Sequence, residues 1–199
     1  MDIPADQAEF LSRTFSGLDL SEASISNRSF DDCQFQDCNF NGALLEHCRF
    51  VDCVFESCNL SVCRLDRCRF SDVRFEGCKL VGIDWTTAQW PSIVLASPVG
   101  FRNCILNDSS FFGLRLPELT LEACKAHQVD FREGDFSAGR FCFSELPGCL
   151  FAHTDLSDAN FTDATDYDID INLNTVRGAR FSRQEAVRLL EHLGIHLED

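Results

Sequence analysis

The chain has 199 residues, of which 32 are acidic and 17 are basic, so its formal net charge at pH 7 is −15. This charge argues against direct nucleic-acid binding, because DNA is itself a polyanion, and it favours a basic partner surface. The sequence has no apolar run long enough to cross a bilayer and no basic, apolar start typical of a signal peptide. We therefore expect a single-domain cytoplasmic protein with no membrane contact.

The chain has an apolar residue at every fifth position. Residues 1–12 are expected to begin or cover the first turn, and from Phe15 to Leu95 all 17 positions of this grid are apolar. The residue two places earlier is usually small. Strands alternate at every second residue and helices repeat about every 3.6, so this period fits neither. It predicts a square coil of four such segments per turn, whose turns stack about 4.8 Å apart as parallel strands.

Cysteine is the commonest small residue of this pattern. Eleven of the twelve cysteines occupy the small inward position, and Cys142 is the exception. Stacked pairs such as Cys38 and Cys58 would be close enough for a disulfide, but their parallel Cβ vectors give it poor geometry. The pattern therefore predicts reduced thiols that fill the core beside Phe and Leu.

Carboxylates gather on one face of the predicted coil. They are Asp31, Asp32, Asp52 and Asp72. The last three recur at the same place in three successive predicted turns, and Arg49 and Arg69 are near enough to neutralise part of this acidic ladder. The ladder is either a partner-binding surface or an ordinary solvated face, because like charges about 5 Å apart in water repel only weakly.

The five-residue pattern shifts by one position between residues 91 and 100. Trp90 keeps the first phase, and Phe101 begins the second. Pro91 and Pro98 each lack an amide donor, so the sequence predicts a turn with one extra residue, and a kink in the rod. This segment is either a structural bulge or a contact site for a partner through Trp90 and Ser97.

The second phase runs from Phe101 to Phe161, is interrupted at Asp166, and resumes at Ile171, Val176 and Phe181. All but two of the 19 phenylalanines lie on the apolar positions. The exceptions, Phe112 and Phe143, should point outward and are candidates for partner contact.

The last segment, 182–199, reads as a helix and tail that follow the repeat domain 1–181. Ser182 and Glu185 form a capping-box pattern, and Gly194 is a plausible stop. The helix should cover the open end of the coil. Its remaining apolar residues suit a two-fold homodimer. They are Val187, Leu190, Leu193, Ile195 and Leu197.

The repeat motif, as in CNFNG at 38–42 and ANFTD at 159–163, resembles that of the pentapeptide-repeat proteins. The resemblance covers roughly residues 13–181 and implies a right-handed quadrilateral β-helix, an all-β fold. Three segments narrow the resemblance to one branch of this family. They are DWTTAQWPS at 84–92, CILNDSSF at 104–111 and ARFS at 179–182. They resemble the topoisomerase-protecting branch, which includes the quinolone-resistance proteins and, more closely, the albicidin-resistance protein. The resemblance implies that the chain binds DNA gyrase by imitating DNA, shields it from a poison, and dimerises through its C-terminal end.

The sequence offers no candidate for catalysis, metal binding or a cofactor. Its five histidines are scattered, its cysteines lack paired C-x-x-C spacing, and it has no phosphate-binding glycine loop. The quinolone-resistance proteins carry long loops, and we expect no comparable insertion here, which favours albicidin over a quinolone. The alternatives are an interaction scaffold with another partner, and a gyrase inhibitor without protective activity.

Overall fold

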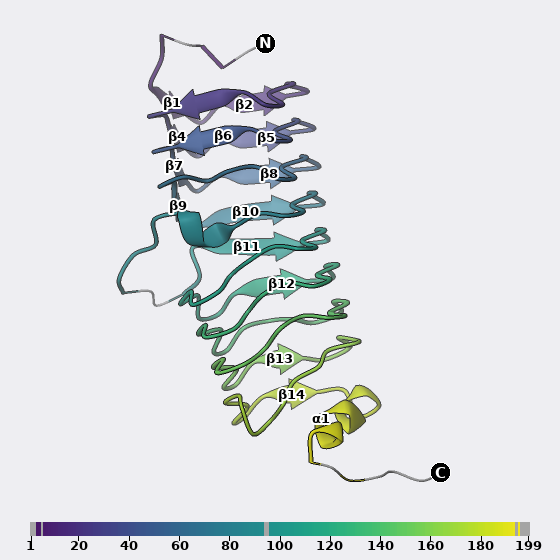
Figure 1. The fold of residues 1–199 in the computed structure, drawn as a ribbon. Coiled ribbons are helices and arrows are strands. Elements are labelled where there is room, and N and C mark those ends of the chain that lie inside the picture. Colours follow the sequence, from purple (N-terminus) through teal and green to yellow (C-terminus); the bar gives the residue numbers. More distant parts are fainter. Residues whose placement is uncertain (1–2, 5, 94–95, 194, 196–199) are drawn as a thin grey trace.

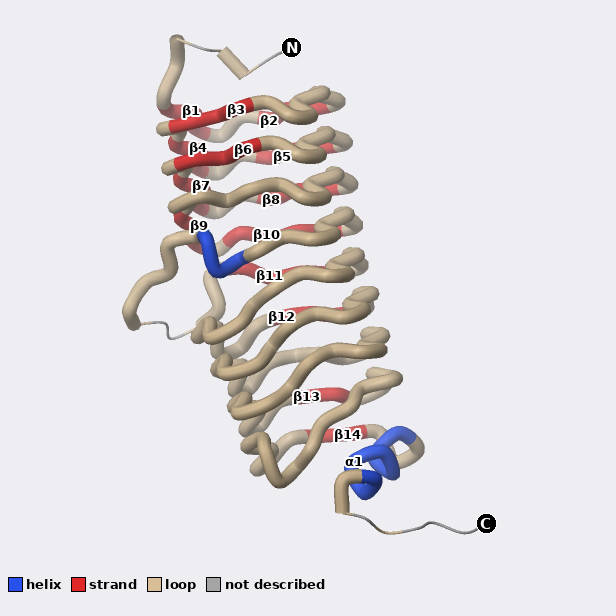
Figure 2. The backbone as a smooth tube through the Cα atoms, viewed as in Figure 1, coloured by secondary structure: helices blue, strands red, loops and turns tan. Residues whose placement is uncertain are grey.

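The computed structural model describes the chain apart from residues 1–2, 5, 94–95, 194 and 196–199. Within it, the chain winds into a parallel β-solenoid of about nine turns with one short C-terminal helix, as the sequence predicts (Figure 1). The turns stack along one axis from the N-terminal to the C-terminal end, and most of the backbone between the short strands is turn (Figure 2). The predicted all-β repeat fold is confirmed.

Each turn has four faces, which we number in chain order. The first face carries β1 (Glu9–Leu11), β4 (Ser29–Asp31), β7 (Arg49–Val51) and β9 (Arg69–Ser71). The second carries β2 (Thr14–Ser16), β5 (Gln34–Gln36), β8 (Val54–Glu56), β10 (Val73–Glu76), β11 (Val99–Arg102), β12 (Thr120–Glu122), β13 (Asn160–Phe161) and β14 (Arg180–Phe181). The third is joined by isolated bridges such as Asp19 to Asn39, and the fourth carries β3 (Ser24–Ser26) and β6 (Leu44–Glu46).

The apolar residue at the centre of each face points inward and stacks on its equivalent in the next turn. The rings of Phe35 and Phe55, for example, are 4.5 Å apart and nearly parallel. Two residues after most centres the chain turns a corner with φ between 49° and 60°, as at Asp52 and Glu118. Asp, Asn and Gly tolerate this left-handed conformation better than other residues, so they recur at the corners.

All twelve cysteines are free and buried. This confirms the prediction for the eleven inward cysteines, whereas Cys142, which lies outside the pattern, is buried without belonging to the core cluster. Five of them follow one another on the third face: Cys38, Cys58, Cys78, Cys104 and Cys124. The sulfur of Cys58 accepts the amide of Cys38 at 3.4 Å, and its thiol donates to the carbonyl of Phe35 at 3.3 Å. Burial raises the pKa of Cys63 and of Cys149 to about 12 each, so these thiols stay protonated at neutral pH.

The interruption near residue 95 is larger than the sequence predicts. Strand β8 pairs with β10 so that Phe55 lies beside Phe75, whereas β10 pairs with β11 so that Phe75 lies beside Phe101. The second step along the chain is longer, so six residues are inserted rather than one. The described residues of this insertion belong to a loop that projects beside η1 (Trp85–Thr87) in Figures 1 and 2. Because the apolar pattern repeats every five residues, an insertion of six residues moves it by one position, just as an insertion of one residue would.

The inserted loop ends at Pro98, which stands at a corner position of the second face. Its backbone carbonyl accepts the amide of Val73 in the preceding turn at 3.0 Å. The fixed negative φ of proline excludes the left-handed turn that most other corners adopt. The chain therefore enters β11 differently from the way it enters the neighbouring strands.

The C-terminal segment is helical over η2 (Glu185–Val187) and α1 (Arg188–Glu191). The predicted capping box is wrong, because the cap residue is Gln184 and its side chain caps nothing. Ser182 Oγ instead accepts the amide of Asp163 at 2.7 Å, and the Glu185 carboxylate accepts that of Asp166 at 3.3 Å. Both side chains thus tether the segment to the last turns, where Leu189 packs against the core.

The core near Asp166 is completed by residues outside the five-residue pattern. Tyr167 and Ile169 are fully buried, while Ile171, which the pattern places inside, is only half-buried. The ring of Tyr167 lies 5.4 Å from that of Phe181. Burial raises the pKa of Tyr167 to about 12, and among the described residues its hydroxyl has no hydrogen-bond partner.

Replacing Tyr167 with phenylalanine is expected to stabilise the protein. The substitution keeps the ring and removes an unpaired buried hydroxyl, whose desolvation costs about 1–3 kcal/mol. The melting temperature should therefore rise, by about 2–4 °C for each kcal/mol regained. Thermal unfolding followed by circular dichroism measures this, and a lower melting temperature would contradict the assignment.

Candidate partner-binding surface

The structure brings the predicted ladder onto one edge of the rod. Asp32, Asp52 and Asp72 occupy the corner between the first and second faces in three successive turns. All three are exposed, and Asp31 is half-buried beside the first of them. Ser12, one turn earlier, donates its hydroxyl to Asp32 at 2.7 Å. Successive corners are thus held about 4.8 Å apart by the strand register.

The ladder continues beyond the inserted loop, which the sequence pattern did not predict. Beyond the loop, the same corner passes through Pro98 and then Glu118, and Asp158 follows two turns later. Both carboxylates are exposed. Counting the offset from Phe75 to Phe101 would have found them. We call these residues the acidic edge: Asp32, Asp52, Asp72, Glu118 and Asp158.

The acidic edge keeps its full charge. None of its carboxylates forms an ion pair within the described part of the chain. The expectation that Arg49 and Arg69 neutralise it is not met, because Arg69 Nε donates instead to Gln89 at 2.8 Å. The edge is therefore a line of uncompensated negative charge that is available to a partner.

The inserted loop leaves and rejoins the solenoid within the acidic edge, at residues that the sequence singles out. At its start, Trp90 is half-buried, stacks on Phe70 at 5.9 Å and donates its indole N–H to the Trp85 carbonyl at 2.9 Å. At its end, Ser97 donates to the Val99 carbonyl at 2.7 Å. Ile93, within the loop, is 80% exposed. The loop thus presents an apolar side chain from a firmly packed base.

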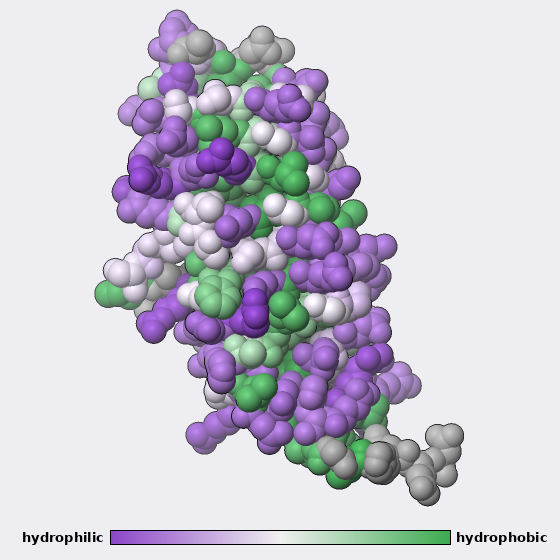
Figure 3. Space-filling model, viewed as in Figure 1, coloured by the Kyte–Doolittle hydropathy of each residue, from purple (hydrophilic) through white to green (hydrophobic). Residues whose placement is uncertain are grey.

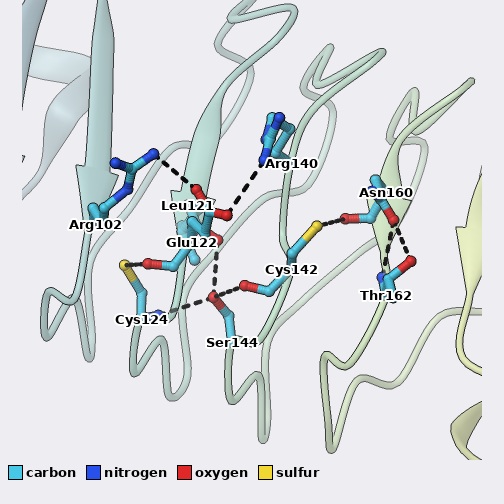
Figure 4. A network of polar contacts seen from close by, with 9 residues as sticks. All are labelled: Arg102, Leu121, Glu122, Cys124, Arg140, Cys142, Ser144, Asn160 and Thr162. Carbon is cyan, nitrogen blue, oxygen red and sulfur yellow. Dashed lines mark hydrogen bonds and ion pairs between the residues drawn. The ribbon is translucent and has the colours of Figure 1, made fainter.

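On the neighbouring second face, one carboxylate beyond the inserted loop is compensated by arginines. The Glu122 carboxylate lies between two arginines and pairs with Arg102 at 3.0 Å and Arg140 at 3.3 Å (Figure 4). The thiol of Cys142 is buried beside this network, where it contacts the Asn160 carbonyl at 3.6 Å. This contrast sets the acidic edge apart from the adjoining surface.

Comparison with known proteins agrees with this geometry. A family model described as a pentapeptide repeat region matches residues 28–97 and 83–161. The chain belongs to the pentapeptide repeat family. No curated protein sequence matches it.

Solved structures of other pentapeptide repeat proteins share the fold. HetL, which is involved in heterocyst differentiation regulation in the cyanobacterium Nostoc sp. strain PCC 7120, has a TM-score of 0.68 at 16% identity, over 86% of this chain and 84% of HetL. A trypsin-treated variant of QnrB1, a plasmid-mediated fluoroquinolone resistance protein, has a TM-score of 0.50 at 23% identity, over 96% of this chain and 92% of that one. At these sequence identities the similarity shows a common fold alone. It says nothing about whether these proteins bind the same partner.

The two outward phenylalanines of this pentapeptide repeat protein lie apart from each other and from the acidic edge. Phe112, 40% exposed, is on the fourth face below the guanidinium of Arg132, whose carbon lies 5.7 Å from the ring centre. Phe143, 58% exposed, is at the corner between the second and third faces. Figure 3, viewed toward β3 and β6, shows a mainly hydrophilic surface broken by smaller hydrophobic patches. The structure therefore does not join these rings into one contact site.

The C-terminal segment leaves apolar side chains uncovered. Val187, Leu193 and Ile195 are each nearly half exposed, and Leu190 is half-buried. Leu197, which the sequence also assigns to a dimer interface, lies outside the described residues. His192 on this segment contacts the Asp168 carboxylate of the preceding turn at 2.5 Å.

The described residues contain neither a cluster of metal ligands nor a membrane-spanning helix. No group of three or more His, Cys, Asp and Glu side chains is placed to hold a metal ion. No helix among these residues is long and apolar enough to cross a bilayer.

Proposed function

We propose that this pentapeptide repeat protein binds DNA gyrase, a type II topoisomerase, by imitating duplex DNA, and protects it from a gyrase-poisoning antibiotic such as albicidin or a quinolone. It acts by binding rather than by catalysis. The acidic edge is the observation that supports this proposal, since it holds unpaired carboxylates in line along a rigid rod. Gyrase as the partner follows from the sequence resemblance.

Charge and dimension make the imitation physically reasonable. A net charge of −15 over about nine turns gives about −1.7 for each rise of about 4.8 Å. Duplex DNA carries about −3 over the same length. A basic surface shaped for DNA would therefore attract the rod, with an association that weakens as salt rises.

The inserted loop changes the choice of drug. Its expected absence favours albicidin over a quinolone, but the register shows a six-residue insertion that interrupts the acidic edge. The chain thus has an inserted loop after all, and both drugs belong in the test.

The decisive experiment is a gyrase supercoiling assay with the purified protein, with and without albicidin or a fluoroquinolone, at two salt concentrations. We expect recovery of supercoiling with at least one drug, stronger at low salt. Inhibition without recovery would leave a gyrase inhibitor. No effect at low salt would leave an interaction scaffold with another partner.

We further propose that the protein forms a homodimer through its C-terminal segment, where Val187 and Leu193 are apolar and exposed. Replacing both with glutamate should convert a dimer to a monomer, because two charges would be buried in an apolar interface. Sedimentation equilibrium measures the change. The control is Leu150→Glu, a similarly exposed leucine on the fourth face, which should leave the dimer intact. A wild-type monomer at micromolar concentration would contradict the proposal.

A further inference from the structure

A hollow of about 260 Å³ lies where the inserted loop rejoins the second face. Strands β10, β11 and β12 form its floor, and the end of the loop, at Ser97 and Pro98, forms one wall. Asp72 and Glu118 of the acidic edge stand on either side of that wall. The hollow thus opens where the inserted loop interrupts the acidic edge. Within the described chain, no other turn of this edge carries an insertion.

Gly100, the second residue of β11, lines the hollow, and neither the backbone nor the packing requires a glycine there. Most of the other described glycines occupy left-handed corners: Gly17, Gly42, Gly77, Gly82, Gly113, Gly148 and Gly178. Gly134 and Gly139 lie where a Cβ would collide with the rings of Phe136 and Phe141. At Gly100 a Cβ would meet only Thr120, whose Cβ lies at an ordinary 3.6 Å.

A glycine in a strand weakens it and marks a place where another group approaches closely. The equivalent outward positions in neighbouring turns carry Arg74 and Thr120. The missing side chain at Gly100 is therefore best explained by a guest that occupies the space from outside.

The unpaired charges around the hollow are mainly negative. Asp72, Glu76 and Glu118 line it without an ion-pair partner among the described residues. Arg102 also lines it, but its guanidinium is turned to Glu122 (Figure 4). Only Arg74 opposes the three free carboxylates. The hollow therefore favours a positively charged guest.

We propose that the hollow receives an arginine side chain of the partner surface, which deepens and rests on the proposed function. Its volume falls below the range of pockets for drug-sized ligands and suits one long side chain. A guanidinium can bind carboxylates in two-point geometry, and arginine is enriched among the residues that dominate interface energies. The apolar stem would lie over the bare Gly100 backbone, with the charged head between the carboxylates.

Gly100→Thr tests the inference through two effects of opposite sign. The strand gains a side chain of high β-propensity whose Cβ meets only Thr120 at an ordinary distance, so the melting temperature should rise by about 1–4 °C. Filling the hollow should weaken binding to purified gyrase by about tenfold. Val54→Thr, in the same outward column but away from the hollow, is the control and should leave affinity unchanged. Unchanged affinity in Gly100→Thr would overturn the inference.

A probe without gyrase separates this inference from the proposed function. N-acetyl-arginine-N-methylamide, titrated into ¹⁵N-labelled protein, should shift the amide signals of Gly100 and Thr120 in a saturable way. The uncharged citrulline analogue should not, and Asp72→Asn with Glu118→Gln should weaken the arginine effect. Equal shifts with citrulline, or an arginine effect that persists in Gly100→Thr, would overturn the hollow as an arginine site. If gyrase does not bind the wild-type protein, the proposed function fails, and this titration still decides whether the hollow takes arginine.

Discussion

Replacing Asp32, Asp52 and Asp72 together with asparagine is expected to weaken gyrase binding about 100-fold at low salt and to abolish protection. The three carboxylates form the unbroken part of the acidic edge and have no ion pairs to lose among the residues that the structure describes. Charge on such a surface acts mainly by raising the association rate, by a factor of about 10 to 1,000. Asparagine tolerates the left-handed corner, so the fold should persist.

A matched variant isolates position from net charge. Glu22→Gln, Asp37→Asn and Asp108→Asn change three exposed, unpaired corner carboxylates on other edges. Both triple variants remove three negative charges from the net charge of −15. Surface plasmon resonance against immobilised gyrase, over a salt series, compares them. If both lose the same affinity, the edge has no special role and the protein's overall charge accounts for binding.

Removing the inserted loop should abolish drug protection while leaving the solenoid folded. Deleting residues 91–96 brings Trp90 and Phe101 to the normal spacing of five. Replacing Pro98 with aspartate then supplies a corner residue that accepts a left-handed φ and fills the gap between Asp72 and Glu118. A shorter connection costs less entropy to close, so stability should not fall.

The expected outcome is a variant that still binds gyrase but no longer restores supercoiling in the presence of drug. Binding is measured on the same sensor surface, and protection in the supercoiling assay. A variant that protects as well as the wild type would assign the loop no part in protection. The same deletion with asparagine in place of Pro98 serves as the control for the added charge, because asparagine also accepts the left-handed φ.

The repeat predicted the fold almost completely because one five-residue rule places the core side chains. This rule could predict neither the length of an insertion nor a core residue that lies outside the pattern. An insertion of six residues leaves the same phase as an insertion of one, so the loop, Glu118 and Asp158 were missed. Tyr167 was missed because it fills the core from outside the pattern.

The candidate site was only partly predictable. The sequence identified Asp32, Asp52 and Asp72 by spacing alone, and the structure puts Ser97 in one surface hollow with Asp72. It did not predict that the surface arginines would leave the ladder unpaired, because rotamer choice depends on neighbours in other turns. The capping box was wrongly predicted for the same reason, because the side chains of Ser182 and Glu185 accept hydrogen bonds from backbone amides of the preceding turn.

The corners of the solenoid also bear on how such a surface can evolve. Most corner residues are exposed, and a corner residue needs only to tolerate a left-handed backbone. Aspartate, asparagine and glycine all meet that need and interconvert by small changes, with little effect on folding. Natural selection can therefore rewrite the charge along an edge one turn at a time, and adapt the rod to a new partner while its buried phenylalanines and cysteines stay the same.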